Sequence, residues 1–242
     1  MDRSTRDESS RERTREIAAM FDKVAPRYDF LNRVLSARRD VGWRRRAVAL
    51  ARLGPDQVAL DVGVGTGDLA FDLLAASAPT ARVIGVDVSP AMLEVARKRA
   101  ASSLVGARFE ARQADVHALP FDDAFFDRVV AGFAVRNFAD LAAGLGEMRR
   151  VLRPGGRAVI LELSTPPNAA VRAAFGLYFG QISPRIAALL GGDPGAYRYL
   201  PRSVARFPGA ERLADLLGAA GFRTVYFERL ALGIAVLHVA ER

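Results

Sequence analysis

The chain has 242 residues, half of them hydrophobic, and a formal net charge of +8; this length suits one domain with a sizeable core. It contains no cysteine and only two histidines, far apart, so disulfides, cysteine nucleophiles and iron–sulfur chemistry are excluded and no metal is expected. The basic balance is compatible with nucleic acid, anionic lipid or acidic substrates, and equally with an arginine-rich composition of no functional meaning.

The N-terminal residues 1–16 hold five arginines and five acidic residues, with no large apolar residue after Met1. This composition predicts a disordered tail and gives no sign of a signal peptide. Residues 17–52 then carry apolar side chains at helical spacing, which predicts helices ahead of the main domain.

From residue 55 onward, short apolar runs alternate with segments of helical periodicity. The predicted strands are Val58–Val62, Arg82–Asp87, Phe109–Ala114, Phe126–Ala131, Arg157–Leu163, Phe222–Glu228 and Ile234–Ala240. The predicted helices are Leu69–Ala78, Met92–Ala101, Leu141–Leu152 and Ala210–Ala220, and Ser89 with Pro90 marks the start of the second. The alternation predicts an α/β fold, a doubly wound and mostly parallel sheet of seven strands whose last two are antiparallel. Residues 17–242 are therefore expected to form a single domain.

A membrane-spanning helix is not expected, because no window reaches the roughly 18 uninterrupted apolar residues that a span needs. The most apolar window, Ala169 to Leu190, is interrupted by Arg172, Gln181, Pro184 and Arg185. The default expectation is a soluble cytoplasmic protein.

The loop from Asp61 to Asp68 follows the first strand, where an open α/β sheet binds its ligands. A dinucleotide fingerprint starting at Gly63 would need a third glycine at position 68, but Asp68 stands there and would repel a pyrophosphate. S-adenosylmethionine fits better, because it lacks phosphate and carries a sulfonium and an ammonium cation. The residues expected to bind it in this loop are Asp61, Gly63, Gly65 and Gly67.

Acidic residues also end the next two strands. Asp87 is placed to accept both ribose hydroxyls, and Asp115 to meet an adenine amino group. The alternative is that these carboxylates merely cap helices or turns.

Further motifs resemble those of known methyltransferases. The turn Leu152 to Gly156 resembles that of class I methyltransferases, and the resemblance implies their Rossmann-like sheet. A closer resemblance is to the ubiquinone/menaquinone-biosynthesis C-methyltransferases of the UbiE/MenG type. It is carried by Phe21 to Asp29 with Leu31-Asn32, Asp61 to Leu69, Ala118 to Phe121, Phe133 to Asn137, and Tyr197 to Leu200 with Ser203. Val64 departs from the family's usual glycine.

The resemblance implies S-adenosylmethionine-dependent methylation of a ring carbon on a polyprenylated quinol, a menaquinone or ubiquinone precursor. It implies that the cofactor is bound by Thr66, Asp87, Asp115, Val116 and Gly132. Two catalytic residues are hypothesised: Asp68 to order a water or the acceptor hydroxyl, and Arg136 to stabilise the phenolate. The alternative for Asp68 is that it is an acid at a helix N-terminus, favoured by the helix dipole. The alternative for Arg136 is a salt bridge that fixes the loop.

Residues 164–207 interrupt the alternation with prolines and aromatic residues, and are interpreted as a helical lid insertion over an isoprenoid tail or as a packing insertion. Tyr197 and Tyr199 would share one face of an extended segment, and Tyr28 is expected to close the other side of the substrate pocket. The basic clusters Arg38-Arg39 and Arg44–Arg46 are candidates for contact with anionic lipid at the inner face of a membrane, or form solvated helix faces.

Other functions stay open at this stage: a methyltransferase for another small aromatic or lipid acceptor, a nucleic-acid methyltransferase, and a non-catalytic cofactor-binding protein. Nucleic acid is the less expected partner, because no Asn-Pro-Pro-aromatic motif and no catalytic cysteine are present. The sequence leaves open whether the chain forms a homodimer.

Overall fold

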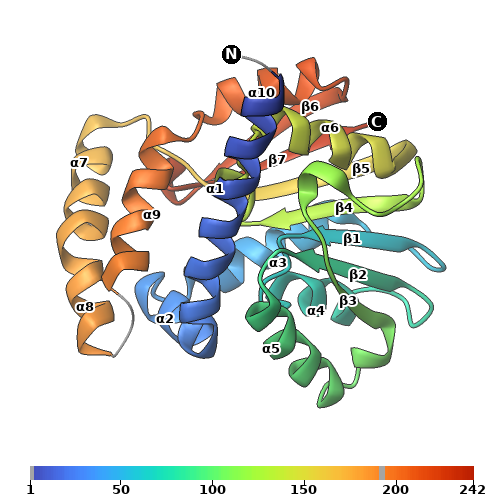
Figure 1. Cartoon of the computed structure of the whole chain (residues 1–242), viewed down its shortest axis with the longest axis horizontal. Helices are drawn as coiled ribbons and strands as arrows, with labels where there is room; N and C mark the ends of the chain where they lie inside the picture. The colour runs from blue at the N-terminus through green and yellow to red at the C-terminus, as the bar shows by residue number, and fades with distance from the viewer. Residues whose placement is uncertain (1–2, 191–193) are drawn as a thin grey trace.

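The computed structural model describes residues 3–190 and 194–242, with side chains for 8–190 and 199–242. Its strands form one seven-stranded sheet in the order β3-β2-β1-β4-β5-β7-β6 (Figure 1). They are β1 (Val58–Val62), β2 (Arg82–Asp87), β3 (Phe109–Gln113), β4 (Phe126–Gly132), β5 (Leu152–Leu163), β6 (Arg223–Leu230) and β7 (Ala235–Glu241). Strands β1 to β5 pair in parallel, whereas β7 runs antiparallel to both β5 and β6. The predicted doubly wound, mostly parallel sheet is confirmed.

Helices cover both faces of this sheet. They are α1 (Arg3–Val24), α2 (Tyr28–Leu35), α3 (Arg39–Ala51), α4 (Asp68–Ala75), α5 (Pro90–Ala101), α6 (Leu141–Val151), α7 (Ala169–Leu177), α8 (Ser183–Leu189), α9 (Pro194–Arg206) and α10 (Ala210–Ala219). Alternate strand residues point to opposite faces, so the core divides into two apolar clusters. One joins the sheet to α3, α4 and α5, and the other joins it to α6 and α10.

Local sequence signals set the start of α5. The Ser89 side chain accepts a hydrogen bond from the Met92 N–H at 3.1 Å, and Pro90 occupies the first helical position. Both features are predicted by the sequence, because an N-cap oxygen satisfies a free amide and proline lacks the amide that the first turn would leave unpaired. The Ser89 hydroxyl also donates to Asp22 of α1 at 2.6 Å.

The N-terminal segment differs from its prediction. Residues 3–16, expected to be disordered, continue as helix with residues 17–24 in α1. Figure 1 shows α1 running across the edge of the sheet to which the parallel strands point. Because the sheet edge and α5 lie beneath it, α1 can be helical without a continuous apolar face of its own.

Residues 164–207, predicted to form a helical lid insertion, are mostly helical, and this includes the segment around Tyr199 that was considered as extended. They form α7, a π-helical turn η5 (Tyr178–Ile182), α8 and α9. Pro184 and Pro194 fit because each lies in the first turn of a helix. Figure 1 shows these helices at the left, beyond the carboxyl ends of the parallel strands. No helix in the described part of the chain is long and apolar enough to cross a membrane.

Candidate functional site

The loop after β1 requires glycine at defined positions. Gly63 has φ +68°, and a Cβ atom there would lie 2.4 Å from Cβ of Ala134. Gly67, at φ +91°, forms the N-cap of α4. Val64, by contrast, is buried over Gly85 of β2 and needs no left-handed backbone, which explains how valine replaces the family's glycine.

Asp61, near the end of β1, is a buried carboxylate with an unusual environment. Its side chain is 1% exposed, and neither oxygen has a hydrogen-bond partner of normal geometry among the described residues. Burial first, and then the charge of Asp87, raise the pKa of Asp61 well above its usual range, while the Ala70 N–H opposes this weakly. A buried carboxylate without a partner is costly, so the site fits a ligand that brings a cation such as an ammonium group.

Asp87, at the end of β2, is held in one orientation. One of its oxygens accepts from the Gly65 N–H and the other from the Ser89 N–H, both at 2.9 Å. Burial raises the pKa of Asp87, and these amide bonds oppose the shift. The carboxylate is thus fixed at the strand end, where vicinal hydroxyls of a ribose can donate to it.

Asp115 follows β3 and is oriented by His117. One Asp115 oxygen accepts from the His117 N–H at 3.0 Å and lies 2.5 Å from Nδ1 of the same histidine. Burial alone would raise the pKa of Asp115, but the bonds from His117 hold it below its usual value. His117, one of the two histidines of the chain, therefore holds the Asp115 carboxylate in position.

Two cavities open along the carboxyl edge of the sheet. The strand-end cavity is lined by the ends of β2 and β3, including Asp87, Asp115, Val116 and His117, and by Thr14 of α1. The α2 cavity is lined by residues of α2, α3 and the glycine loop, including Asp61 and Thr66. The residues common to both are Tyr28, Gly63, Gly65, Gly132 and Phe133. A ligand in the strand-end cavity therefore meets one in the α2 cavity beside the glycine loop and Tyr28.

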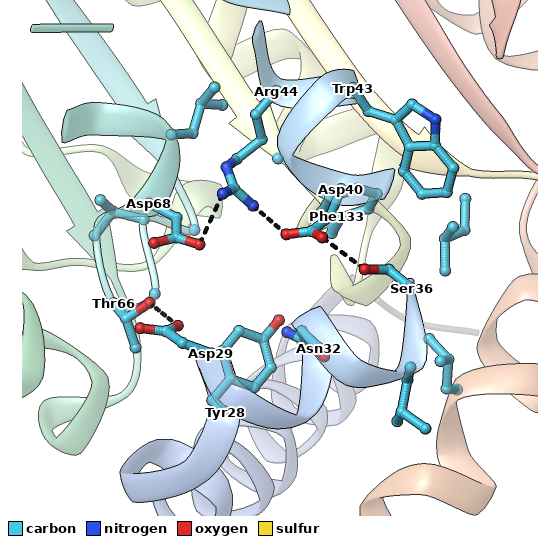
Figure 2. A pocket seen from close by; sticks show the side chains of 18 of the residues that line it. Tyr28, Asp29, Asn32, Ser36, Asp40, Trp43, Arg44, Thr66, Asp68 and Phe133 are labelled. Atoms are coloured by element: carbon cyan, nitrogen blue, oxygen red, sulfur yellow. Dashed lines mark hydrogen bonds and ion pairs between the residues drawn. The ribbon is translucent and has the colours of Figure 1, made fainter. Parts of the chain in front are cut away.

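The α2 cavity has a polar side and an aromatic side (Figure 2). Arg44 of α3 pairs with Asp40 at 2.6 Å and with Asp68 at 3.2 Å, and Ser36 donates to Asp40 at 2.6 Å. On the aromatic side, the Trp43 and Phe133 rings lie 6.3 Å apart. Because Arg44 is buried in ion pairs, it does not provide the lipid contact considered for the Arg44–Arg46 cluster.

Arg136, in the turn η4 (Val135–Asn137), forms a buried ion pair at the α2 cavity. Its Nη1 donates to Glu162 of β5 at 2.7 Å and to the Phe133 carbonyl at 2.5 Å. Its Nε is buried without a partner among the described residues. Burial alone would lower the pKa of Arg136, but Glu162 raises it, so the cation is maintained. The salt bridge considered as an alternative thus exists, and a free donor remains beside it.

Asp68 is the first residue of α4 and is surrounded by cations. It pairs with Arg99 at 2.7 Å, with Arg44 at 3.2 Å and with Arg33 at 3.6 Å. These contacts match the alternative interpretation of a helix N-terminal acid that links elements, although Asp68 also lines the α2 cavity. Its catalytic role stays a prediction.

Tyr28 reaches both cavities, as predicted for a pocket residue. Burial, partly offset by Arg136, raises the pKa of its hydroxyl. Tyr199 lies elsewhere: its hydroxyl donates to Asn137 at 3.0 Å, and its ring borders a separate cleft on the far side of Arg136. The Tyr197 side chain lies outside the described residues. The backbone of α9 is helical, so the extended segment on which the prediction for Tyr197 and Tyr199 rested is not formed.

Several lining residues were missed by the sequence analysis. Thr14 was assigned to a disordered tail, although it lines the strand-end cavity. Asp29 accepts from the Thr66 hydroxyl at 2.5 Å and pairs with Arg99 at 3.0 Å, and the sequence carried no signal for this three-element contact beyond its family motif. Among the side chains that the structure describes, no cluster of metal-binding residues is found.

A mostly parallel seven-stranded sheet with an antiparallel β7, a glycine loop after β1 and acids near the ends of β1 and β2 define the class I methyltransferase fold. Solved structures agree on this fold. The [4+2]-cyclase SpnF has a TM-score of 0.72 at 18% identity, covering 95% of this chain and 96% of that chain. A SAM-dependent methyltransferase from Aquifex aeolicus has a TM-score of 0.59 at 17% identity, covering 81% of this chain and 88% of that one.

The chain belongs to the ubiE/COQ5 methyltransferase family, whose model matches residues 8–242. It is 48% identical to a demethylmenaquinone methyltransferase of Thermus thermophilus, over 92% of this chain and all of that protein. It is also 48% identical to one of Deinococcus radiodurans, over 93% of this chain and 92% of that protein. A ubiquinone/menaquinone biosynthesis C-methyltransferase UbiE of Geobacter sulfurreducens is 41% identical, over 96% and 90% respectively.

Proposed function

We propose that the chain transfers a methyl group from S-adenosylmethionine to a ring carbon of a polyprenylated quinol, with demethylmenaquinol as the principal acceptor. Family membership and the names of the 48%-identical relatives support this acceptor. The observation that carries the proposal is the junction of the two cavities at Tyr28, Gly132 and Phe133, beside the partnerless carboxylate of Asp61.

The strand-end cavity suits the nucleoside of S-adenosylmethionine, and the α2 cavity suits its ammonium group together with the quinol ring. Asp87 and Asp115 would bind the ribose hydroxyls and the adenine amino group, and Asp61 the ammonium group. When bound, S-adenosylmethionine supplies an electrophilic methyl group on a sulfonium. The aromatic side of the α2 cavity would hold the quinol ring. Holding the two reactants in line can contribute about 7–11 kcal/mol in favourable cases.

The protein must also help a hydroxyl of the quinol lose its proton, because the phenolate makes the ring carbon nucleophilic. The free Nε of Arg136 would donate to the developing phenolate oxygen. Asp68 would orient a water or the hydroxyl, with its charge shared among the arginines around it. Such electrostatic and proton-transfer assistance is worth roughly 10²–10⁴-fold in rate.

A polyprenylated acceptor resides in a membrane, so we also propose that the enzyme works from the cytoplasm at the inner face of the membrane. Mass spectrometry of quinones from a deletion strain tests the function. The expected result is accumulation of a menaquinone precursor lighter by one methyl group, restored by the wild-type gene. An unchanged quinone pool would overturn the proposal, and loss of methyl from ubiquinone alone would overturn the choice of acceptor.

A further inference from the structure

The outer surface of α2 and of the α7–η5–α8 segment is rich in exposed apolar side chains. Of the nine large hydrophobic side chains exposed in the described part of the chain, five lie on α2 and on the α7–η5–α8 segment. They are Phe30, Val34, Leu177, Ile182 and Leu189, and their exposed fractions range from 39% to 87%. We call these five residues, together with the exposed Arg38, Arg39 and Arg185, the α2–α8 face. Clustered exposed apolar side chains of this kind mark an interaction site.

The two parts of the α2–α8 face are joined. Leu31 and Leu35 on the inner side of α2 pack against Ala187 of α8. The Tyr178 hydroxyl donates to the Leu35 carbonyl at 2.9 Å, and Arg27 donates to the Leu190 carbonyl at 3.0 Å. The inner side chains therefore fix the helices together, while Phe30 and Val34 remain outside. Figure 1 shows α2, α7 and α8 gathered on one side of the molecule, away from the sheet.

The α2–α8 face adjoins the cavity that would hold the quinol ring. Leu35 of α2 and Phe179 of η5 both line the α2 cavity. Val34, next to Leu35 in the sequence, and Leu177, two residues before Phe179, are exposed on the α2–α8 face. The α2–α8 face is therefore the outer side of the same elements whose inner side borders the cavity.

Among the residues that the structure describes, the charge exposed on the α2–α8 face is of one sign. Residues 169–190 contain no acidic residue and two arginines, and Arg38, Arg39 and Arg185 are exposed. The acidic residue nearest on α2, Asp29, is turned inward to Thr66 and Arg99. An apolar surface bordered by arginines matches the interface of an anionic bilayer, where leucines enter the acyl boundary and arginines meet phosphates.

We infer that the α2–α8 face docks the enzyme on an anionic membrane surface, so that the quinol enters the α2 cavity directly from the bilayer. The inference rests on the proposed function for the identity of the substrate. It explains why the most apolar window of the sequence, 169–190, is interrupted by charged residues: this segment lies along a membrane rather than across it.

The test compares full-length variants for binding to phosphatidylglycerol/phosphatidylcholine vesicles. Leu177→Gln combined with Ile182→Gln removes two central side chains of the α2–α8 face. Leu104→Gln combined with Leu232→Gln is the matched control, because both residues are exposed in other loops. We expect the first pair to weaken vesicle binding by about tenfold or more and the control pair to leave it unchanged. Binding should weaken as salt rises or phosphatidylglycerol is omitted.

A second measurement maps the contact directly. Because the chain has no cysteine, Leu177→Cys and Leu104→Cys each accept a single environment-sensitive fluorophore. If vesicles shift the fluorophore's emission to the blue at position 177 and not at position 104, the inference is supported. Equal shifts, or vesicle binding unaffected by the Leu177/Ile182 pair, would overturn it, as would a dimer in solution that this pair dissociates.

Turnover in detergent on a quinol with a truncated side chain separates the two proposals. The Leu177/Ile182 pair should retain wild-type turnover there and lose it on long-chain quinol in vesicles. If the wild type fails on the truncated quinol, the proposed function fails, and the vesicle assays still decide the docking surface.

Discussion

Asp61 is the residue where cofactor binding and stability are coupled, because its carboxylate is buried without a hydrogen-bond partner of normal geometry among the described residues. Asp61→Asn should weaken binding of S-adenosylmethionine by about 10–100-fold, through loss of a charged contact. The same change should raise the free energy of unfolding of the cofactor-free chain by about 1 kcal/mol, since a buried unpaired charge is removed. Calorimetric titration and thermal unfolding measure the two effects, and a fall in both affinity and stability would contradict this account.

The pH dependence of Asp61 has a definite sign. Its pKa is raised in the folded chain, so the folded state binds the proton more tightly than the unfolded state. The stability contributed by Asp61 is therefore present at low pH and lost as pH rises through the window between the two pKa values. Asp61→Asn should remove this dependence on pH from the free energy of unfolding, measured by urea unfolding of the cofactor-free chain at a series of pH values. If the free energy of unfolding of the variant changes with pH as in the wild type, another group causes the dependence.

Arg136 permits a test of the chemical step. Arg136→Lys keeps a cation for Glu162 but removes the Nε donor, and should lower kcat by about 10²-fold with little change in cofactor affinity. The control is Arg153→Lys, at an exposed ion pair with Asp127 remote from both cavities. Full turnover in the Arg136 variant would show that its role is the salt bridge alone.

At the residue scale, the sequence predicted the side chains whose positions follow from strand ends. Asp61, Asp87 and Asp115 could be located because parallel strands bring their carboxyl ends to one edge. Arg44 and Glu162 could not, because their roles depend on pairing with elements distant in sequence. A buried guanidinium has the same sequence pattern as an exposed one until its partners are placed around it.

At the element scale, α1 gives the clearest test. If it covers the strand-end cavity as the structure shows, deletion of residues 1–16 removes Thr14 and should weaken cofactor binding by about tenfold, mainly through faster dissociation. Stopped-flow dissociation of the cofactor measures this. A truncated chain with unchanged dissociation would mean that the segment behaves as the disordered tail predicted from its composition.

Residues 164–207 were predicted as a helical lid insertion, but the bounds of its separate helices were not. Pro184 and Pro194 lie in first helical turns, where proline is tolerated, and Pro201 lies inside α9. The parallel strands β1, β2 and β4 are mostly buried and read as short apolar runs, whereas the edge strand β3 is only partly buried. Most strands and the helices between them were predicted to within a few residues, but β5 begins at Leu152, five residues before its predicted start. The bounds of α1 and α9 depend on the elements that these helices cover.

At the scale of the whole molecule, the fold brings two cavities together at the glycine loop, one suited to a nucleoside and the other to an aromatic ring. The proposed docking of the α2–α8 face would place the second cavity at a membrane. This arrangement would account for the exposed apolar surface of the lid helices. A methyltransferase that acts on a small soluble acceptor has no need of such a surface.

The most direct test of the central claim is turnover by the purified chain, with S-adenosylmethionine labelled in its methyl group and a reduced demethylmenaquinol of short side chain. We predict that mass spectrometry will find the label on a ring carbon of the quinol, and that Asp61→Asn will require much more cofactor for the same rate. Label on a quinol oxygen, or no label on the quinol while the cofactor binds tightly, would contradict the account.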